Sequence, residues 1–148
     1  AQVYNQEHTA DIVCLAVHPS GRFVATGQLG KRPTVVVWDA DTGATLSTLD
    51  GFHARAVTHV AFHAHSDLLF TVGLDDNHSV AVYDWRRALH RANSKGDRGK
   101  VLDVAWSPAK SEGAPVLQVG VRHARLWTVD GRALKSSRVS LRGTSAEN

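Results

Sequence analysis

The stretch HARAVTHVAFHA at positions 53–64, followed by SVAVYDW at 79–85, is repeated twice more in this sequence of 148 residues. The earlier copy reads HTADIVCLAVHP from His8 and VVVWDADTG from Val35, and the later copy reads DRGKVLDVAWSP from Asp97 and ARLWTVDG from Ala124. Successive copies begin 45 and 44 residues apart. A sequence motif repeated at this period indicates one structural unit that stacks against copies of itself.

Each copy continues with further short apolar runs at matching offsets. Second runs follow at 23–27, 68–73 and 116–120, and third runs end on an aromatic residue, at Trp38, Tyr83 and Trp127. More polar fourth runs are found at 44–49 and 88–92. Short runs rich in Val, Thr and aromatic residues, separated by Gly, Asp and Asn, predict strands, and no segment shows a sustained helical period.

The repeat therefore predicts an all-β fold, a WD-repeat β-propeller with about three four-stranded blades. A β-sandwich also has closely spaced strands, but it does not require the same phrase at a fixed period. We expect blades at 6–50, 51–94 and 95–142, the outer strand of a preceding blade at 1–5, and a tail at 143–148. Since propellers close with about four to eight blades, we expect an incomplete ring that pairs with further blades of the same full-length chain or with other copies of itself.

The composition is that of a globular protein, with 43% hydrophobic and 21% charged residues. Cys14 is the only cysteine, so an internal disulfide is excluded and a reducing compartment is expected. The opening AQVYNQEH lacks the features of a secretory leader, and no run approaches the roughly 18 apolar residues of a membrane helix. We therefore expect no membrane partner.

The basic residues are dispersed, although the formal net charge is +3. The densest groups are Arg86 with Arg87 and the segment 135–142. A nucleic-acid-binding surface is usually marked by a basic stripe or by interleaved aromatic residues, and this sequence has neither. We expect a solvated basic surface and no nucleic-acid partner.

The residues at the turns of these repeats are more specific than the general WD-repeat pattern. Gly27-Gln28 with Gly30 and Pro33, and Gly73 with the run 75–78, stand where an ordinary WD blade has a short Asp-Gly turn. With these features, ATGQLGKRPTVVVWDADTG (25–43), TVGLDDNHSVAVYDW (71–85) and VGVRHARLW (119–127) resemble the echinoderm microtubule-associated protein-like family. The resemblance covers about residues 4–131. It implies two propellers in tandem, tubulin or microtubules as partner, and a place on the cytoplasmic cytoskeleton, including axonemal microtubules.

A His, a Thr and an Asp are expected to converge in the second blade, at His53, Thr71 and Asp75. Such a set resembles the nucleophilic triad of a hydrolase. In WD blades, however, these residues form a buried hydrogen-bonded network, and we expect them to stabilise the blade and not to catalyse a reaction. The first blade keeps His8, Thr26 and Trp38, with Gly30 at the position of the Asp. The third blade has Asp97 and Gln118 at these positions, and we expect it to have lost the network.

Three further patterns could suggest a bound ion or cofactor. His59, His63 and His65 alternate on one run, but nearby Cys or acidic residues that would complete a metal site are missing. The run 27–31 lacks the glycine spacing and the helix of a phosphate loop, and Asp75-Asp76-Asn77 lacks the twelve-residue calcium loop. We therefore expect no metal, no cofactor and turn residues at these positions.

These observations predict a non-catalytic protein-interaction scaffold. The contacts are expected in exposed turns, and the candidate positions are Gln28, Lys31, Arg32, Asp76, Asn77, His78, Arg122 and His123. One alternative is a general WD-repeat assembly scaffold without a cytoskeletal role. Another is a propeller hydrolase that uses His59, His63, Asp75 or His78, since the fold by itself does not exclude catalysis. An enzyme would bring these side chains together at one end of the channel, whereas a scaffold would disperse them among turns.

Overall fold

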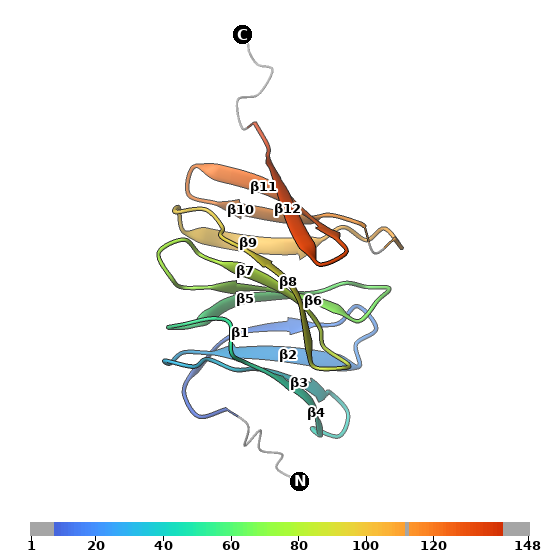
Figure 1. Ribbon diagram of the computed structural model, residues 1–148. Coiled ribbons are helices and arrows are strands. Elements are labelled where there is room, and N and C mark those ends of the chain that lie inside the picture. The colour runs from blue at the N-terminus through green and yellow to red at the C-terminus, as the bar shows by residue number, and fades with distance from the viewer. Residues whose placement is uncertain (1–7, 112, 141–148) are drawn as a thin grey trace.

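The computed structural model describes residues 8–111 and 113–140, and these form three four-stranded antiparallel sheets. In each sheet, strands that are consecutive in the chain are neighbours. The sheets stack face to face in chain order (Figure 1). The described residues contain no helix, and so none that could cross a membrane. The predicted all-β propeller fold is confirmed.

Each sheet is one blade of the propeller, and the strand bounds follow the sequence pattern. The strands of blade one are β1 (Ile12–Val17), β2 (Phe23–Gln28), β3 (Val35–Asp39) and β4 (Thr45–Leu49). Those of blade two are β5 (Val57–Phe62), β6 (Leu68–Gly73), β7 (Val80–Asp84) and β8 (Leu89–Ser94). Those of blade three are β9 (Val101–Trp106), β10 (Val116–Gly120), β11 (His123–Asp130) and β12 (Ala133–Arg138). The outer strand expected at 1–5 and the tail expected at 143–148 lie outside the described residues.

Blade two is buried on both faces because it lies between the other two. Every residue of β6 is buried, and its side chains alternate between the two interfaces. Leu69 belongs to the apolar core shared with blade one, together with Val37 and Trp85. Phe70 belongs to the core shared with blade three, together with Trp127. A strand covered on both sides is expected to be mostly apolar, as the sequence LLFTVG is apart from Thr71.

Blades one and three each have one face without a neighbour among the described residues. In blade one, Leu15 of β1 is 65% exposed and Val17 is 54% exposed. In blade three, Leu102 of β9 is 57% exposed and Leu117 of β10 is 43% exposed. The two end faces of the stack therefore present apolar strand residues of the kind that blade two buries.

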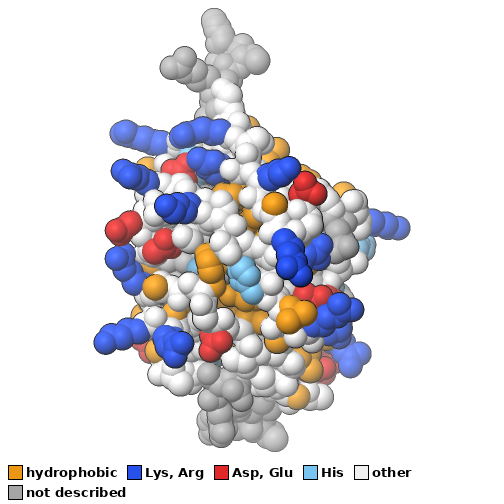
Figure 2. Space-filling view, viewed as in Figure 1, with side chains coloured by type: hydrophobic (Ala, Val, Ile, Leu, Met, Phe, Trp, Pro, Cys, Tyr) orange, Lys and Arg blue, Asp and Glu red, His pale blue; other side chains and the backbone are white. Residues whose placement is uncertain are grey.

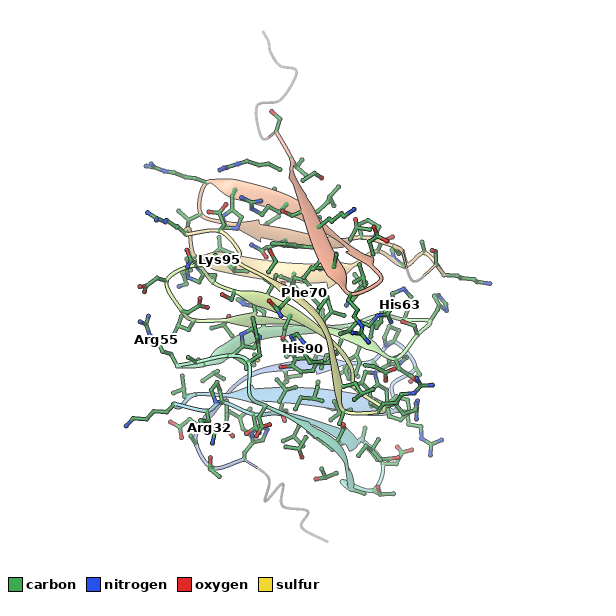
Figure 3. The ribbon with its side chains drawn as sticks, in the orientation of Figure 1. Arg32, Arg55, His63, Phe70, His90 and Lys95 are labelled. Atoms are coloured by element: carbon green, nitrogen blue, oxygen red, sulfur yellow. The ribbon has the colours of Figure 1, made fainter. Side chains whose placement is uncertain are left out.

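The stack has two rims. The crossover rim contains the β2–β3, β6–β7 and β10–β11 turns and the segments 50–56 and 95–100, through which the chain passes from one blade to the next. The hairpin rim contains the β1–β2 and β3–β4 turns and their equivalents in the other blades. Figure 3 labels Arg32, Arg55 and Lys95 on the crossover rim, at the left, and His63 on the hairpin rim, at the right.

Candidate functional site

A chain of hydrogen bonds lies under the crossover rim in blade one. The Trp38 indole N–H donates to Thr26 Oγ1 at 3.3 Å, and Thr26 Oγ1 lies 2.7 Å from His8 Nε2. His8 Nδ1 lies 2.8 Å from Gln28 Oε1. A neutral His8 that carries its proton on Nδ1 satisfies every pair: Thr26 O–H donates to His8, and His8 donates to the Gln28 amide oxygen. The expected residues His8, Thr26 and Trp38 are thus brought together.

Gln28 completes this network in place of the missing Asp. Its Oε1 also accepts from the Thr34 hydroxyl at 2.7 Å and from the Thr9 backbone N–H at 3.2 Å. Gln28 is only 2% exposed, so the expectation that it contacts a partner is corrected to a structural role. Gly30 has no side chain that could supply an acceptor, and the Gln28 side chain, at the end of β2, reaches the imidazole instead. The signal in the sequence was a Gln within an apolar strand in a blade that lacks the Asp.

In blade two the network is shorter than expected. His53 Nε2 lies 2.7 Å from Thr71 Oγ1, and the Thr71 hydroxyl is within 3.3 Å of the Ala81 carbonyl. Asp75 does not bond to His53; its two carboxylate oxygens accept from the Ser79 N–H at 2.8 Å and the Ser79 hydroxyl at 2.7 Å. His53 Nδ1 has no hydrogen-bond partner among the described residues. Of the three residues expected to form one network, His53 and Thr71 are hydrogen-bonded to each other and Asp75 is bonded to Ser79 instead.

The protonation of His53 and Asp75 follows from these surroundings. Burial lowers the pKa of His53 to about 4, although the charge of Asp75 opposes this shift. A neutral His53 that donates from Nε2 to Thr71 leaves a bare lone pair, and not an N–H, at the unpartnered Nδ1. Burial opposes the ionisation of Asp75, but the hydrogen bonds from Ser79 outweigh it and lower the pKa of the carboxyl. Thr71 is fully buried, so a substrate could not reach its hydroxyl.

Blade three has a network of its own, and the expectation that it was lost is wrong. The Trp127 indole N–H donates to Gln118 Oε1 at 3.1 Å, and Gln118 Nε2 lies 3.0 Å from His123 Nε2. His123 Nδ1 lies 3.2 Å from the Val121 carbonyl. The imidazole comes from β11 and not from the segment before the first strand, so the repeat alignment did not find it.

His123 is therefore a structural residue and not a contact residue. It is 1% exposed, and a Cβ at Gly120 would lie 2.2 Å from its Cε1 atom, so the strand end must be glycine. Its Nδ1 lies 3.6 Å from Asp97 Oδ1. Burial opposes ionisation of Asp97, but the Gly99 N–H, His123 and Arg125 together lower the pKa of this carboxyl.

The other candidate contact residues lie at the surface of the crossover rim. Lys31, Arg32, Asp76 and Arg122 are exposed, and Asn77 and His78 are half-buried. Asp76 pairs with Arg55 at 3.0 Å. His78 Nδ1 lies 2.8 Å from the Asp97 carbonyl, so His78 ties its turn to the next crossover segment.

Cations without ion-pair partners collect on this rim. Six Lys and Arg side chains of the rim are exposed and form no ion pair with any residue that the structure describes. These cations are Lys31, Arg32, Lys95, Arg98, Lys100 and Arg122. Figure 2 shows Lys and Arg side chains along the left edge beside all three sheets. Two exposed acids of the rim, Asp11 and Asp50, are also without an ion pair to a described residue.

On the hairpin rim most charges are paired with each other. Arg22 pairs with Asp39 at 3.5 Å, and Arg86 pairs with Asp67 at 3.1 Å. Two further pairs join Arg87 to Asp84 at 3.9 Å and Lys135 to Asp130 at 3.1 Å. The exposed cations Lys110 and Arg132 have no such partner in the described part of the chain.

The histidines considered for catalysis or metal binding are dispersed. His59 Nε2 lies 3.3 Å from the Leu102 carbonyl, between two blades. His63 Nε2 lies 2.9 Å from the Ser111 carbonyl on the hairpin rim, opposite to Asp75 and His78. The described residues contain no group of three or more His, Cys, Asp or Glu side chains placed to hold a metal. The side chains named for the hydrolase alternative are therefore not gathered at one end of the described blades.

Comparison with solved structures identifies the fold. A β-propeller domain from Myceliophteria thermophila superposes with a TM-score of 0.73 at 16% identity, over 95% of this chain and 42% of that chain. A chain in the mitotic checkpoint complex gives a TM-score of 0.72 at 20% identity, over 92% of this chain and 42% of that chain. At these identities the likeness concerns the fold alone.

Comparison with curated proteins identifies the family. Echinoderm microtubule-associated protein-like 1 of Rattus norvegicus is 33% identical over an alignment of 138 positions that covers 86% of this chain and 17% of that protein. Echinoderm microtubule-associated protein-like 2 of Mus musculus is 34% identical over 86% of this chain and 21% of that protein. The chain thus spans about a fifth or less of the length of these relatives. The family model for the echinoderm microtubule-associated protein first beta-propeller matches residues 1–147, and the chain belongs to that family.

Proposed function

We propose that this chain is part of a non-catalytic propeller that binds tubulin or microtubules through the turns of its crossover rim. The observation that carries the proposal is the match of residues 1–147 to the microtubule-associated family. The unpaired cations of the rim support it, because tubulin has acidic surfaces and opposite charge favours encounter. The protein would then act on the cytoplasmic cytoskeleton, on cytoplasmic or axonemal microtubules.

Further blades are the second kind of partner in this proposal. Leu15 and Val17 at one end of the stack, and Leu102 and Leu117 at the other, resemble the residues that pack between blades. Exposed apolar patches of this kind mark surfaces that another element covers. We expect further blades of the full-length chain to cover them, and we propose neither a nucleic acid nor a membrane as partner.

Lys31 and Arg32 are the first residues to test. Both are exposed in the β2–β3 turn, which Gln28 anchors from below by accepting from the Thr34 hydroxyl and donating to the Leu29 carbonyl. Their side chains can therefore be changed without altering the network. We expect Lys31→Glu with Arg32→Glu to weaken tubulin binding about fivefold at low salt, and less as salt rises, because exposed charges are screened.

The experiment is co-sedimentation of the complete polypeptide with microtubules, and titration with soluble tubulin. Lys110→Glu with Arg132→Glu, on the hairpin rim, makes the same change in charge and serves as the control. If the unaltered complete polypeptide does not bind tubulin or microtubules at low salt, the cytoskeletal proposal fails. A general WD-repeat assembly scaffold would then be the remaining function.

A further inference from the structure

We propose that the crossover rim is a docking surface for an acidic, unstructured polypeptide segment that lies across all three blades. The proposal rests on the proposed function and deepens it, because it names the chemistry of the partner segment and the path of that segment along the rim. Its ligand would be a run of Glu or Asp side chains, and its contacts would be the exposed Lys and Arg side chains of the rim.

The distribution of charge gives the first argument. The unpaired cations come from several loops: Lys31 and Arg32 from blade one, Lys95, Arg98 and Lys100 from the second crossover segment, and Arg122 from blade three. All of these loops belong to the crossover rim, where Figure 3 labels Arg32 and Lys95 on the same edge of the stack. The opposite rim neutralises most of its cations internally, as in the pair of Arg86 and Asp67. Cations without internal partners attract an acidic partner and steer its approach.

The loops of the rim are also joined to one another, and this gives the second argument. The Gly30 N–H donates to the Arg55 carbonyl at 2.8 Å and links blade one to the first crossover segment. His78 Nδ1 lies 2.8 Å from the Asp97 carbonyl, and the Val121 N–H donates to the Lys100 carbonyl at 2.8 Å. The first two bonds link a blade to the crossover segment that leads to the next blade, and the third fixes the end of the second crossover segment on blade three. Because the loops are already fixed, a partner would order little more than its own chain and the surface side chains.

The chemistry of the rim favours a polypeptide over a nucleic acid. Proteins that bind single strands stack bases on exposed aromatic rings. In the described rim loops the one Phe, Tyr or Trp ring is that of Phe52, which packs against His53 at 4.9 Å and His90 at 5.4 Å. Asp11 and Asp50 interrupt the positive charge and would repel a continuous phosphate backbone. A flexible acidic peptide can place its carboxylates on the cations and leave these positions uncontacted.

The test measures binding of a fluorescent oligo-glutamate peptide to the complete polypeptide by anisotropy at low salt. Lys100→Glu with Arg122→Glu alters two exposed cations on neighbouring loops and is expected to weaken binding about tenfold. Lys110→Glu with Arg132→Glu makes the same change in charge on the hairpin rim and is expected to weaken it less than about twofold. Circular dichroism and urea unfolding of each variant show whether the fold is retained.

Three outcomes would overturn the proposal. They are failure of the unaltered protein to bind oligo-glutamate, equal losses in both double variants, and tighter binding of a single-stranded oligonucleotide that the Lys100→Glu, Arg122→Glu variant abolishes. Microtubule co-sedimentation of the same proteins separates the two proposals. Tubulin binding without oligo-glutamate binding removes the acidic segment as the ligand of this rim and keeps the proposed function. Oligo-glutamate binding without tubulin binding keeps the acidic ligand and removes tubulin as the partner.

Discussion

The two rims of the stack are held in order by different means. On the crossover rim, buried polar side chains such as Gln28 and Gln118 form hydrogen-bonded networks with a histidine and a tryptophan. On the hairpin rim one buried imidazole, that of His63, bonds to the Ser111 carbonyl and to the His65 N–H. The other loops of this rim are held by ion pairs and by short turns, as where Asp39 accepts from the Asp41 and Thr42 N–H groups. A loop anchored from below does not need its surface charges for order. This explains how the crossover rim can leave its cations unpaired.

The difference predicts an asymmetry in stability. Removing one partner from a buried hydrogen-bonded pair costs about 1–3 kcal/mol for each group left unsatisfied. An exposed ion pair contributes about 0–1 kcal/mol, and salt screens it. Substitutions beneath the crossover rim should therefore lower the free energy of unfolding more than substitutions of surface charges on the hairpin rim.

The largest effect is expected for Gln118→Ala. This change leaves the buried Trp127 N–H without its acceptor and His123 Nε2 without its donor, and it creates a cavity. We expect the free energy of unfolding to fall by about 3 kcal/mol, measured by urea denaturation. A loss below about 1 kcal/mol would show that the network of blade three contributes no more than a surface ion pair.

A smaller effect is expected for His53→Ala. The imidazole has one bonded nitrogen, to Thr71, and one without a partner among the described residues, so we expect a loss of about 1–3 kcal/mol. Gln28→Ala provides a comparison in blade one, where the histidine is bonded through both nitrogens. An unfolding midpoint unchanged by His53→Ala would mean that the bond to Thr71 does not stabilise the blade.

The stability contributed by His53 should also depend on pH. Its pKa falls from 6.5 to about 4 on folding, so the unfolded chain takes up the proton first as the pH decreases. The contribution is complete above pH 6.5 and declines by roughly 3 kcal/mol as the pH falls toward 4. The difference in unfolding free energy between wild type and His53→Ala should therefore shrink over this range. A difference that is constant from pH 7 to about 4.5 would contradict the assigned burial.

The smallest effect is expected on the hairpin rim, for Arg86→Ala. The guanidinium pairs with Asp67 at 3.1 Å and lies 4.6 Å above the Trp85 ring, but the side chain is about half exposed. We expect a loss of about 0.5–1 kcal/mol, part of which disappears in high salt. A loss as large as that of Gln118→Ala would show that surface charges and buried networks contribute equally.

The sequence by itself determined the strands, the blades and the family. The ranges 68–73 and 116–120, read from the repeat, are the observed β6 and β10, because apolar alternation and turn residues are local features. The pairs of His8 with Thr26 and of His53 with Thr71 also came from the repeat, since they occupy the same offsets in two copies.

Only the tertiary structure decided which polar side chains complete the networks. Gln28 and His123 were expected at the surface because they adjoin turns, yet both are buried beneath the crossover rim. Asp75, expected beside His53, turns to Ser79 instead. A buried donor or acceptor bonds to whichever suitable group lies within about 3 Å in space. Strand register and side-chain length decide which group that is, and the offset along the chain does not.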